Sequence, residues 1–290
     1  KQDEQLYVLK GFAPEKSVEQ IQDKAQIEKW GLLIEDISKE DQVPTMLQNS
    51  KLVNLSKPAL DMIEILPGYD ELDVSPVFLV FFTLFFAMLI GDAAYGAIFL
   101  VLTLLAQIKL KHKVKSQTPF YLMYLLSGFT ILWGVMTATY FGQQWLPEGI
   151  KPILPWLNDF QNIQWLCFTV ALVHLSIARL WSFKKKLPQL TAIAELGWML
   201  IIWGMYFLAN MFVLNKEFPP FAIWFFMVGI SLAFVFMVPF KYFLKQVPQE
   251  TIPFVLSVVG AGTDIISYIR LFAVGLATVA VADAANSMPQ

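Results

Sequence analysis

The fold is decided by the stretch VFLVFFTLFFAMLIGDAAYGAIFLVLTLLAQI, which runs from Val77 to Ile108. Nearly all of its residues are apolar, and the run is interrupted near its middle, at GDAAYG (Gly91–Gly96). About 20 apolar residues are enough for a helix to cross the hydrocarbon core of a bilayer. A backbone in lipid has no water to bond to, so it forms helices or a closed barrel. The stretch therefore predicts membrane helices.

Further apolar runs follow at residues 119–142, 161–182, 190–214, 219–244 and 251–287. Each of them is long enough for a membrane span. Hydrophobic residues make up 57% of the 290-residue chain and charged residues only 15%, which differs clearly from the composition of a soluble domain. We therefore expect a mainly α, polytopic membrane protein.

The loops that connect the runs differ in charge. Lysines gather in Lys109–Lys115, Lys184–Lys186 and Lys241–Lys245, whereas another loop carries Glu148 and Asp159. This alternation fits the rule that cytoplasmic loops are rich in Lys and Arg. A single crossing by the first run would place the charged N-terminal region opposite the first lysine loop. We therefore expect that run to be a hairpin of two helices, which gives about seven membrane helices in all.

The predicted hairpin turns at GDAAYG. Each arm would be only about 20 Å long, shorter than the roughly 30 Å hydrocarbon core, so protein must shelter its tip. The alternative is one long tilted helix. That helix would turn Asp92 toward protein and leave the N-terminal region on the other side of the membrane.

Residues 1–75 are predicted to form a small α+β segment in the cytoplasm. The alternating pattern of Leu6–Phe12 and the run Leu32–Ile37 predict strands. The pattern between them, from Pro14 to about Trp30, predicts a helix.

A linker is expected to join this segment to the membrane. Asp41–Pro76 contains four prolines among polar residues and has no sustained periodicity, so the boundary is predicted near Pro76, with the membrane domain in 76–290. The chain begins at Lys1 without a cleavable leader, so we expect the spans themselves to direct insertion. The missing Met also suggests a fragment of a longer protein.

Sequence motifs of catalysis are absent. The chain has no P-loop, dinucleotide-binding turn, HExxH or nucleophile elbow, so we expect no catalytic residue, no cofactor and no nucleic acid partner. Its one cysteine, Cys167, lies in an apolar run, where it can form neither an intrachain disulfide nor a Cys-type metal site. We expect a buried structural thiol and no bound metal.

Ionisable side chains within the apolar runs are functional candidates by default. They are Asp92, His174, Arg179, Glu195, Asp264, Arg270 and Asp283. Arg270 lies near the middle of the last run, and its guanidinium stays charged there. We expect it to face a carboxylate of another chain, to repel the transported cation and to block a direct leak. The alternative is an internal salt bridge with Glu195 or Asp92.

On a helical projection Arg270 shares a broad face with mostly small side chains. They belong to Thr263, Ile266, Ser267, Ala273, Val274, Ala277 and Val281. Small side chains let another helix approach closely. We therefore expect a partner helix to pack against this face.

A polar path is expected beside Arg270. Glu195 and His174 are costly against lipid, and histidine titrates near neutrality, so both are candidates to line it. A hydrogen bond within the core is the alternative for His174. Asp264, Asp92 and Ser267 are further candidates, and all of these residues are weaker candidates than Arg270.

Arg179 is expected to be structural. It lies close to Trp181 and to the Lys184–Lys186 loop, so its long side chain can reach the headgroups.

Three stretches resemble a known family. GTDIISYIRLFAVGLATVAVADAAN (Gly262–Asn286) is similar to the arginine-bearing penultimate helix of the a/I subunit of V-type and A-type rotary ATPases, and its SYIRLFAVGLA core is a specific signal. ELDVSPVFLVFFTLFFAMLIGDAAYG (Glu71–Gly96) and YVLKGFAP (Tyr7–Pro14) agree with the first hairpin and the cytoplasmic domain of that family. The short loops resemble prokaryotic members, which implies a prokaryotic plasma membrane.

The resemblance implies a static membrane subunit beside a ring of proteolipid subunits. In that family the arginine that matches Arg270 contacts the ring's carboxylates, and two half-channels carry H⁺ or Na⁺ as ATP hydrolysis turns the ring. The N-terminal domain binds peripheral stalks and faces the central-stalk side of the V1/A1 sector. The family has eight membrane helices, so the last helix, with a second arginine, would lie beyond this chain.

Two other classes of protein fit the sequence less well. An autonomous ion-coupled secondary transporter would show broken helices in matching halves, and GDAAYG has no counterpart. A purely structural anchor would not need Arg270, because a charge at the bilayer centre costs several kcal/mol.

Overall fold

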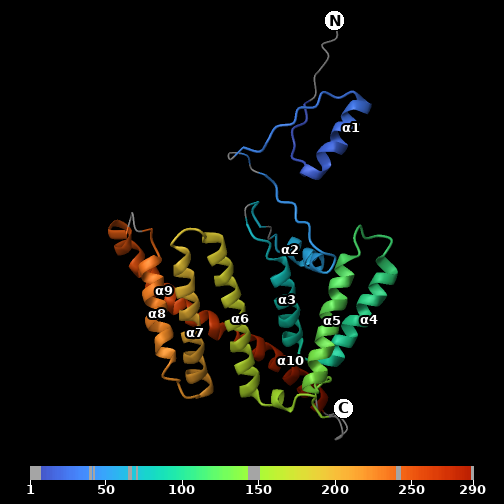
Figure 1. Cartoon of the computed structure of the whole chain (residues 1–290). Coiled ribbons are helices and arrows are strands. Elements are labelled where there is room, and N and C mark those ends of the chain that lie inside the picture. Colours follow the sequence, from blue (N-terminus) through green and yellow to red (C-terminus); the bar gives the residue numbers. More distant parts are fainter. Residues whose placement is uncertain are drawn as a thin grey trace.

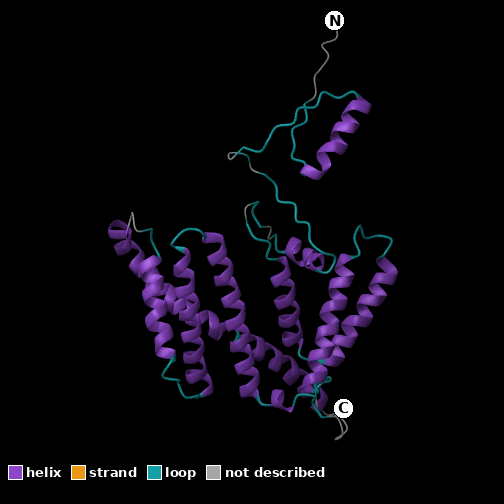
Figure 2. Cartoon of the chain, in the orientation of Figure 1, coloured by secondary structure: helices purple, strands orange, loops and turns teal. Residues whose placement is uncertain are grey.

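The computed structural model describes residues 8–38, 41, 43–64, 67–69, 71–142, 151–239 and 243–288 of the chain. All regular structure within these ranges is helical, as Figures 1 and 2 show. Because several of the helices are apolar and long enough to cross a bilayer, the predicted mainly α, polytopic membrane fold is confirmed.

The two strands predicted near the N-terminus are wrong. Residues 8–12 and Leu32–Ile37 are irregular, while Leu6 and Tyr7 lie outside the described residues. A strand is stable only when a neighbouring strand completes its backbone hydrogen bonds. Neither segment makes such bonds with the part of the chain that the structure describes. An alternating pattern without a pairing partner therefore leaves the chain extended and irregular.

The helix predicted between those segments is present. A 3₁₀ turn, η1 (Glu15–Ser17), leads into α1 (Val18–Glu28). The helix ends at Lys29, which adopts a left-handed conformation with φ 55° and donates its N–H to the carbonyl of Ala25. This closure resembles the common left-handed helix end.

The expected linker contains a short helix of its own. A 3₁₀ turn, η2 (Val53–Ser56), runs into α2 (Lys57–Met62), which has Pro58 in its first turn, where proline is favoured. This helix was not predicted, because six residues are too few to show a period. It packs on α3 and α5 through a small apolar cluster of Ala59, Leu79, Leu122 and Leu126.

The membrane region consists of α3 (Ser75–Ile90), α4 (Ala93–Leu110), α5 (Thr118–Thr137), α6 (Phe160–Lys186), α7 (Ala192–Leu214), α8 (Ala222–Phe236), α9 (Phe243–Ser267) and α10 (Ile269–Ser287). Among the described residues, α4, α5, α6, α7 and the joint segment Val247–Ser287 are long and apolar enough to span a bilayer, and α3 and α8 are shorter apolar helices. Figure 1 shows α3 to α8 standing side by side, with the C-terminal segment running obliquely across them.

The first apolar run forms two helices, α3 and α4, that meet at Gly91 and Asp92. Gly91 has a φ of +67°, which glycine adopts without strain. Asp92 caps α4, since its Oδ1 accepts from the backbone N–H groups of Ala94 at 2.7 Å and Tyr95 at 3.1 Å. In Figure 1 α5 stands between the two arms. The turn is covered by protein, with Asp92 only 1% exposed.

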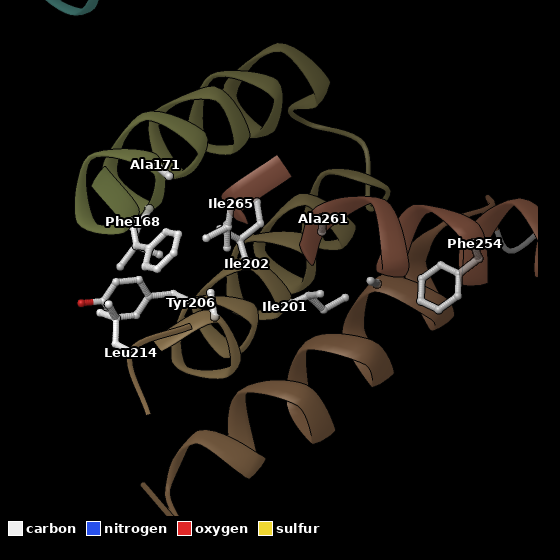
Figure 3. Close-up of a cluster of buried hydrophobic side chains, with 12 residues drawn as sticks. Phe168, Ala171, Ile201, Ile202, Tyr206, Leu214, Phe254, Ala261 and Ile265 are labelled. Carbon is white, nitrogen blue, oxygen red and sulfur yellow. The ribbon is translucent and has the colours of Figure 1, made fainter. Parts of the chain in front are cut away.

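The main apolar core joins α6, α7, α8 and α9. Figure 3 shows Phe168, Ile201 and Ile265 among its members, and all three are 0% exposed. Ile265 lies on α9, so this core fixes the C-terminal segment against the upright helices.

The last apolar run is a single segment with a break at Tyr268, where α9 ends and α10 begins. Val247–Ser287 contains 41 residues, which corresponds to about 60 Å of helix at 1.5 Å per residue. This is about twice the thickness of the hydrocarbon core, so the segment must lie strongly tilted. The oblique course in Figure 1 agrees with that length.

Candidate functional site

Arg270 is the second residue of α10, and its side chain is exposed. Its Nε donates a hydrogen bond to the carbonyl oxygen of Ser267 at 3.1 Å. Within the described ranges the four ion pairs involve other residues. The alternative of an internal salt bridge between Arg270 and Glu195 or Asp92 is therefore not found.

The break beside Arg270 has a defined hydrogen-bond pattern. The N–H of Tyr268 donates to the carbonyl of Ile265 at 3.2 Å, and the N–H of Leu271 donates to the carbonyl of Tyr268 at 3.0 Å. Both bonds reach back three residues, whereas an α-helix reaches back four. The carbonyl of Ser267, which Leu271 would otherwise use, accepts from the side chain of Arg270 instead.

His174 of α6 meets this break from the protein side. Its Nδ1 lies 2.6 Å from the hydroxyl of Tyr268. Phe81 of α3 stacks on the imidazole with ring centroids 4.1 Å apart, and Phe85 meets both His174 and Tyr268 edge-on at 5.8 Å. These four rings, Phe81, Phe85, His174 and Tyr268, form what we call the aromatic cluster. It joins α3 and α6 to the junction of α9 and α10.

Glu195 of α7 is 5% exposed and binds two cations. Its Oε2 lies 3.2 Å from Nη1 of Arg179, and its Oε1 lies 2.5 Å from Nζ of Lys186. The guanidinium of Arg179 also lies over the ring of Trp198, 5.3 Å from its centroid. Arg179 therefore pairs within the protein instead of extending to the headgroups as expected. Burial of a carboxylate is costly unless it is paired and hydrogen-bonded.

The weaker candidates lie in different surroundings. Asp264 is exposed on α9, and the Oγ of Ser267 donates to the carbonyl of Thr263 at 2.7 Å. Asp92 is a buried helix cap whose Oδ2 has no hydrogen-bond partner among the described residues. The structure thus brings Ser267 and His174 to the Arg270 region, whereas Glu195 and Asp92 have partners of their own.

The face of the C-terminal segment around Arg270 is uncovered. Its exposed side chains are those of Thr263, Ile266, Ala273, Val274, Ala277 and Val281. The opposite side is buried at Ile265, Gly275 and Ala282. The predicted broad face and the buried face therefore lie on opposite sides of one helical segment.

One cavity of about 580 Å³ lies between the end of α3, α5, α6 and α10. Its polar lining includes Thr137, Thr139 and Asp283, and Leu271 and Gly275 of α10 line it too. It reaches α10 just beyond Arg270.

A second cavity, of about 410 Å³, lies between the start of α3 and the end of α6, with His174 in its lining. Glu71 and Lys185 also line it, and their side chains form an ion pair at 2.7 Å. The hydrogen bond from Lys185, with a second from the backbone N–H of Gly68, holds the pKa of Glu71 below its ordinary value. The described residues contain no group of three His, Cys, Asp or Glu side chains that could hold a metal ion.

Tyr268 and Lys186 were not singled out from the sequence. Tyr268 lies within an apolar run, and a buried tyrosine hydroxyl usually has a hydrogen-bond partner. Its position in the sequence therefore indicates a polar contact with another part of the protein. Lys186 was interpreted only as one of the lysines that mark a cytoplasmic loop. Its bond to Glu195 joins residues of two helices and shows only in the tertiary structure.

Comparisons with known proteins agree with one another. The chain is 35% identical over 98% of its length to V-type ATP synthase subunit I of Borreliella burgdorferi. It is 31% identical over 97% of its length to V-type ATP synthase subunit I 1 of Treponema pallidum, and 26% identical over 70% to A-type ATP synthase subunit I of Pyrococcus horikoshii. It covers 50%, 48% and 32% of these proteins, so it spans about half the length of the first two. No protein-family model matches the chain.

Proposed function

We propose that this chain, which is similar over 98% and 97% of its length to subunit I of two V-type ATP synthases and over 70% to that of an A-type ATP synthase, is the static, non-catalytic membrane subunit of such a rotary ATPase. It forms ion half-channels against a ring of proteolipid subunits. Arg270 is the residue that couples rotation of the ring to the movement of H⁺ or Na⁺.

The observation that carries this proposal is the exposed guanidinium of Arg270, which no carboxylate of the described residues neutralises. It lies within an apolar segment of 41 residues. A charge at that depth is costly against lipid, and arginine cannot lose its proton. A carboxylate presented by a neighbouring chain would offset the cost.

The uncovered face around Arg270 supports a ring as the partner. Most of its side chains are small, including Ala273 and Ala277, and small side chains let helices approach closely. A ring presents one carboxylate after another to a fixed cation, so each carboxylate would be ionised as it passes Arg270. Arginine would also repel the transported cation and prevent a direct leak.

The remaining polar residues would supply the paths to and from the ring. The two cavities reach toward the C-terminal segment from different ends of the bundle, and they contain Asp283 and His174 respectively. Asp264 and Ser267 lie on the same C-terminal segment as Arg270, and Glu195 is the buried carboxylate of α7. Asp92 is the least suited to a path, because it is engaged as a helix cap.

The lysine-rich loops support a cytoplasmic N-terminal region. In Figure 1 the α4–α5 and α6–α7 connections lie at the same end of the bundle as α1 and α2. The first connection contains Lys113, and Lys186 is the last residue of α6 at the start of the second. Positive loops face the cytoplasm. The N-terminal region would then lie toward the peripheral stalks and the central-stalk side of the V1/A1 sector, with a prokaryotic plasma membrane as the site of the complex.

The test is ATP-driven ion uptake into vesicles that contain the assembled complex with the full-length subunit. Arg270→Ala and Arg270→Lys are expected to abolish uptake, because alanine has no charge and a lysine ammonium cannot bind a carboxylate through two parallel hydrogen bonds. Lys184→Ala is the matched control, since Lys184 is an exposed cation outside the candidate site. Uptake near that of wild type in both Arg270 variants, at equal assembly, would show that Arg270 is structural.

A further inference from the structure

We propose that Tyr268 and His174 are positioning residues for Arg270. Their hydrogen bond fixes the helix break that frees the carbonyl of Ser267, and this carbonyl holds the side chain of Arg270. The proposal rests on the proposed function, because it explains how the coupling arginine is aimed.

The helix break leaves one backbone carbonyl without its usual donor. Around Tyr268 the backbone bonds reach back three residues instead of four, so the Ser267 carbonyl is not used by Leu271. An unpaired carbonyl at membrane depth is costly. Arg270 satisfies it through Nε at 3.1 Å. The break therefore produces an acceptor within reach of the arginine.

The bond to the Ser267 carbonyl uses only part of the guanidinium. An arginine has five N–H donors, and one of them, on Nε, is used by Ser267. The donors on the two terminal nitrogens stay available on the exposed side of the segment. Two parallel N–H donors match the two oxygens of a carboxylate. The bond to Ser267 thus orients the side chain while leaving its binding end free.

The break is kept in place by a side-chain contact. No proline lies at the junction, since the prolines of α9 are Pro248 and Pro253. The hydroxyl of Tyr268 instead lies 2.6 Å from Nδ1 of His174. This bond crosses from the C-terminal segment to α6 and is the polar contact at the centre of the aromatic cluster.

The aromatic cluster also holds His174 in one orientation. Phe81 stacks on the imidazole, and Phe85 packs against the edges of both hydrogen-bonded rings. Both phenylalanines belong to α3, the first arm of the hairpin. α3 and α6 therefore act together as a support on which the break, and with it Arg270, is held.

His174 could instead carry an ion, and one pair of substitutions separates the two roles. Glutamine at position 174 has an amide that bonds to a tyrosine hydroxyl but does not titrate. If His174 positions the break, His174→Gln keeps ion uptake. If His174 carries an ion, His174→Gln abolishes ion uptake. His174→Leu removes the hydrogen bond and is expected to fail in the positioning role.

The experiment uses the assembled complex with the full-length subunit, and it measures ions taken up per ATP hydrolysed over a range of pH. Tyr268→Phe and His174→Leu are expected to lower this ratio about five- to tenfold, as the loss of one hydrogen bond allows. His174→Gln is expected to keep both the ratio and the pH profile of wild type. Trp203→Phe is the matched control, since Trp203 bonds to Ser176 of the same helix α6 at 3.1 Å without touching the break.

The outcomes distinguish a failure of the positioning role of Tyr268 and His174 from a failure of the coupling role of Arg270. If Arg270→Ala blocks uptake while Tyr268→Phe and His174→Leu leave the ratio at the wild-type value, the positioning role is overturned and the coupling role of Arg270 stands. Loss of uptake in His174→Gln with an altered pH profile would also overturn it, in favour of an ion carrier. If Tyr268→Phe does not assemble, the contrast between His174→Gln and His174→Leu decides alone. Uptake in Arg270→Ala would remove the proposed function itself.

Discussion

Asp92 shows how a carboxylate can lie inside an apolar run without a counter-ion. Its Oδ1 accepts two backbone N–H groups at the start of α4, and the positive end of the helix dipole favours a negative charge there. The residue is buried at the turn of the hairpin. Its geometry is that of a helix cap, which weakens its candidacy for the ion path.

This role leads to a prediction for position 92. Asp92→Ala is expected to lower the free energy of unfolding by about 1 kcal/mol, because the cap is lost. Asp92→Asn is expected to be nearly neutral, because an asparagine oxygen caps equally well. Thermal unfolding of the protein in detergent measures the difference. An Asn variant that is as stable as wild type yet blocks ion uptake in the complex would mean that Asp92 carries an ion.

At the scale of helices, glycines decide which elements can touch. A Cβ on Gly134 of α5 would lie 2.0 Å from the backbone nitrogen of Ala93 at the hairpin turn. A Cβ on Gly275 of α10 would lie 2.6 Å from the carbonyl oxygen of Met88. Both neighbours are backbone atoms, which cannot rotate away as a side chain can. Because Gly134 and Gly275 have no side chain, α5 and α10 can pack directly against the turn between α3 and α4.

A matched pair of substitutions on α5 tests this contact. Gly134→Ala is expected to destabilise the protein by about 1–3 kcal/mol or more, because the added methyl group overpacks the contact. Gly128→Ala is the control, since a Cβ there meets nothing within 4 Å, and alanine favours a helix over glycine by up to about 1 kcal/mol. Unfolding of both variants in detergent gives the comparison. Equal stability of the two would contradict the close packing of the turn.

At the scale of the whole molecule, the hairpin sets the topology. Because α3 and α4 turn at Gly91 and Asp92, the chain returns to the end of the bundle from which it started, as Figure 1 shows. At that end, the ion pair of Glu71 and Lys185 joins the segment before α3 to the last turn of α6. The oblique C-terminal segment crosses the bundle from there, and Asn286 reaches the carbonyl of Phe141 near the opposite end.

This arrangement predicts which loops share a side of the membrane. The native Cys167 is free but buried, so labelling reports on introduced cysteines. Lys16, Lys113 and Ile153 can each be replaced by a single cysteine and labelled with a membrane-impermeant reagent in sealed vesicles. Cysteines at Lys16 and Lys113 are expected to react from one side, and a cysteine at Ile153, in the α5–α6 connection, from the other. Reaction of Lys16→Cys and Lys113→Cys from opposite sides would instead favour a single crossing by the first run.

The positions of the membrane helices follow largely from the sequence alone. They depend on local quantities: the length of an apolar run and the charge of the loops beside it. Lipid leaves a backbone little choice but helix, so apolar length translates directly into structure. The strand predictions at Leu6–Phe12 and Leu32–Ile37 failed because a strand depends on a partner that its own sequence does not specify.

Only the tertiary structure decided which polar groups meet. Glu195 binds Arg179 and Lys186 of another helix, and His174 bonds to Tyr268, which is 94 residues away in the chain. The sequence has no proline or glycine at the break beside Arg270, and the contacts of Tyr268 with α3 and α6 are seen only in the tertiary structure. Side-chain partners across helices depend on how the helices pack, and packing is set by the whole set of contacts at once, not by any one stretch of sequence.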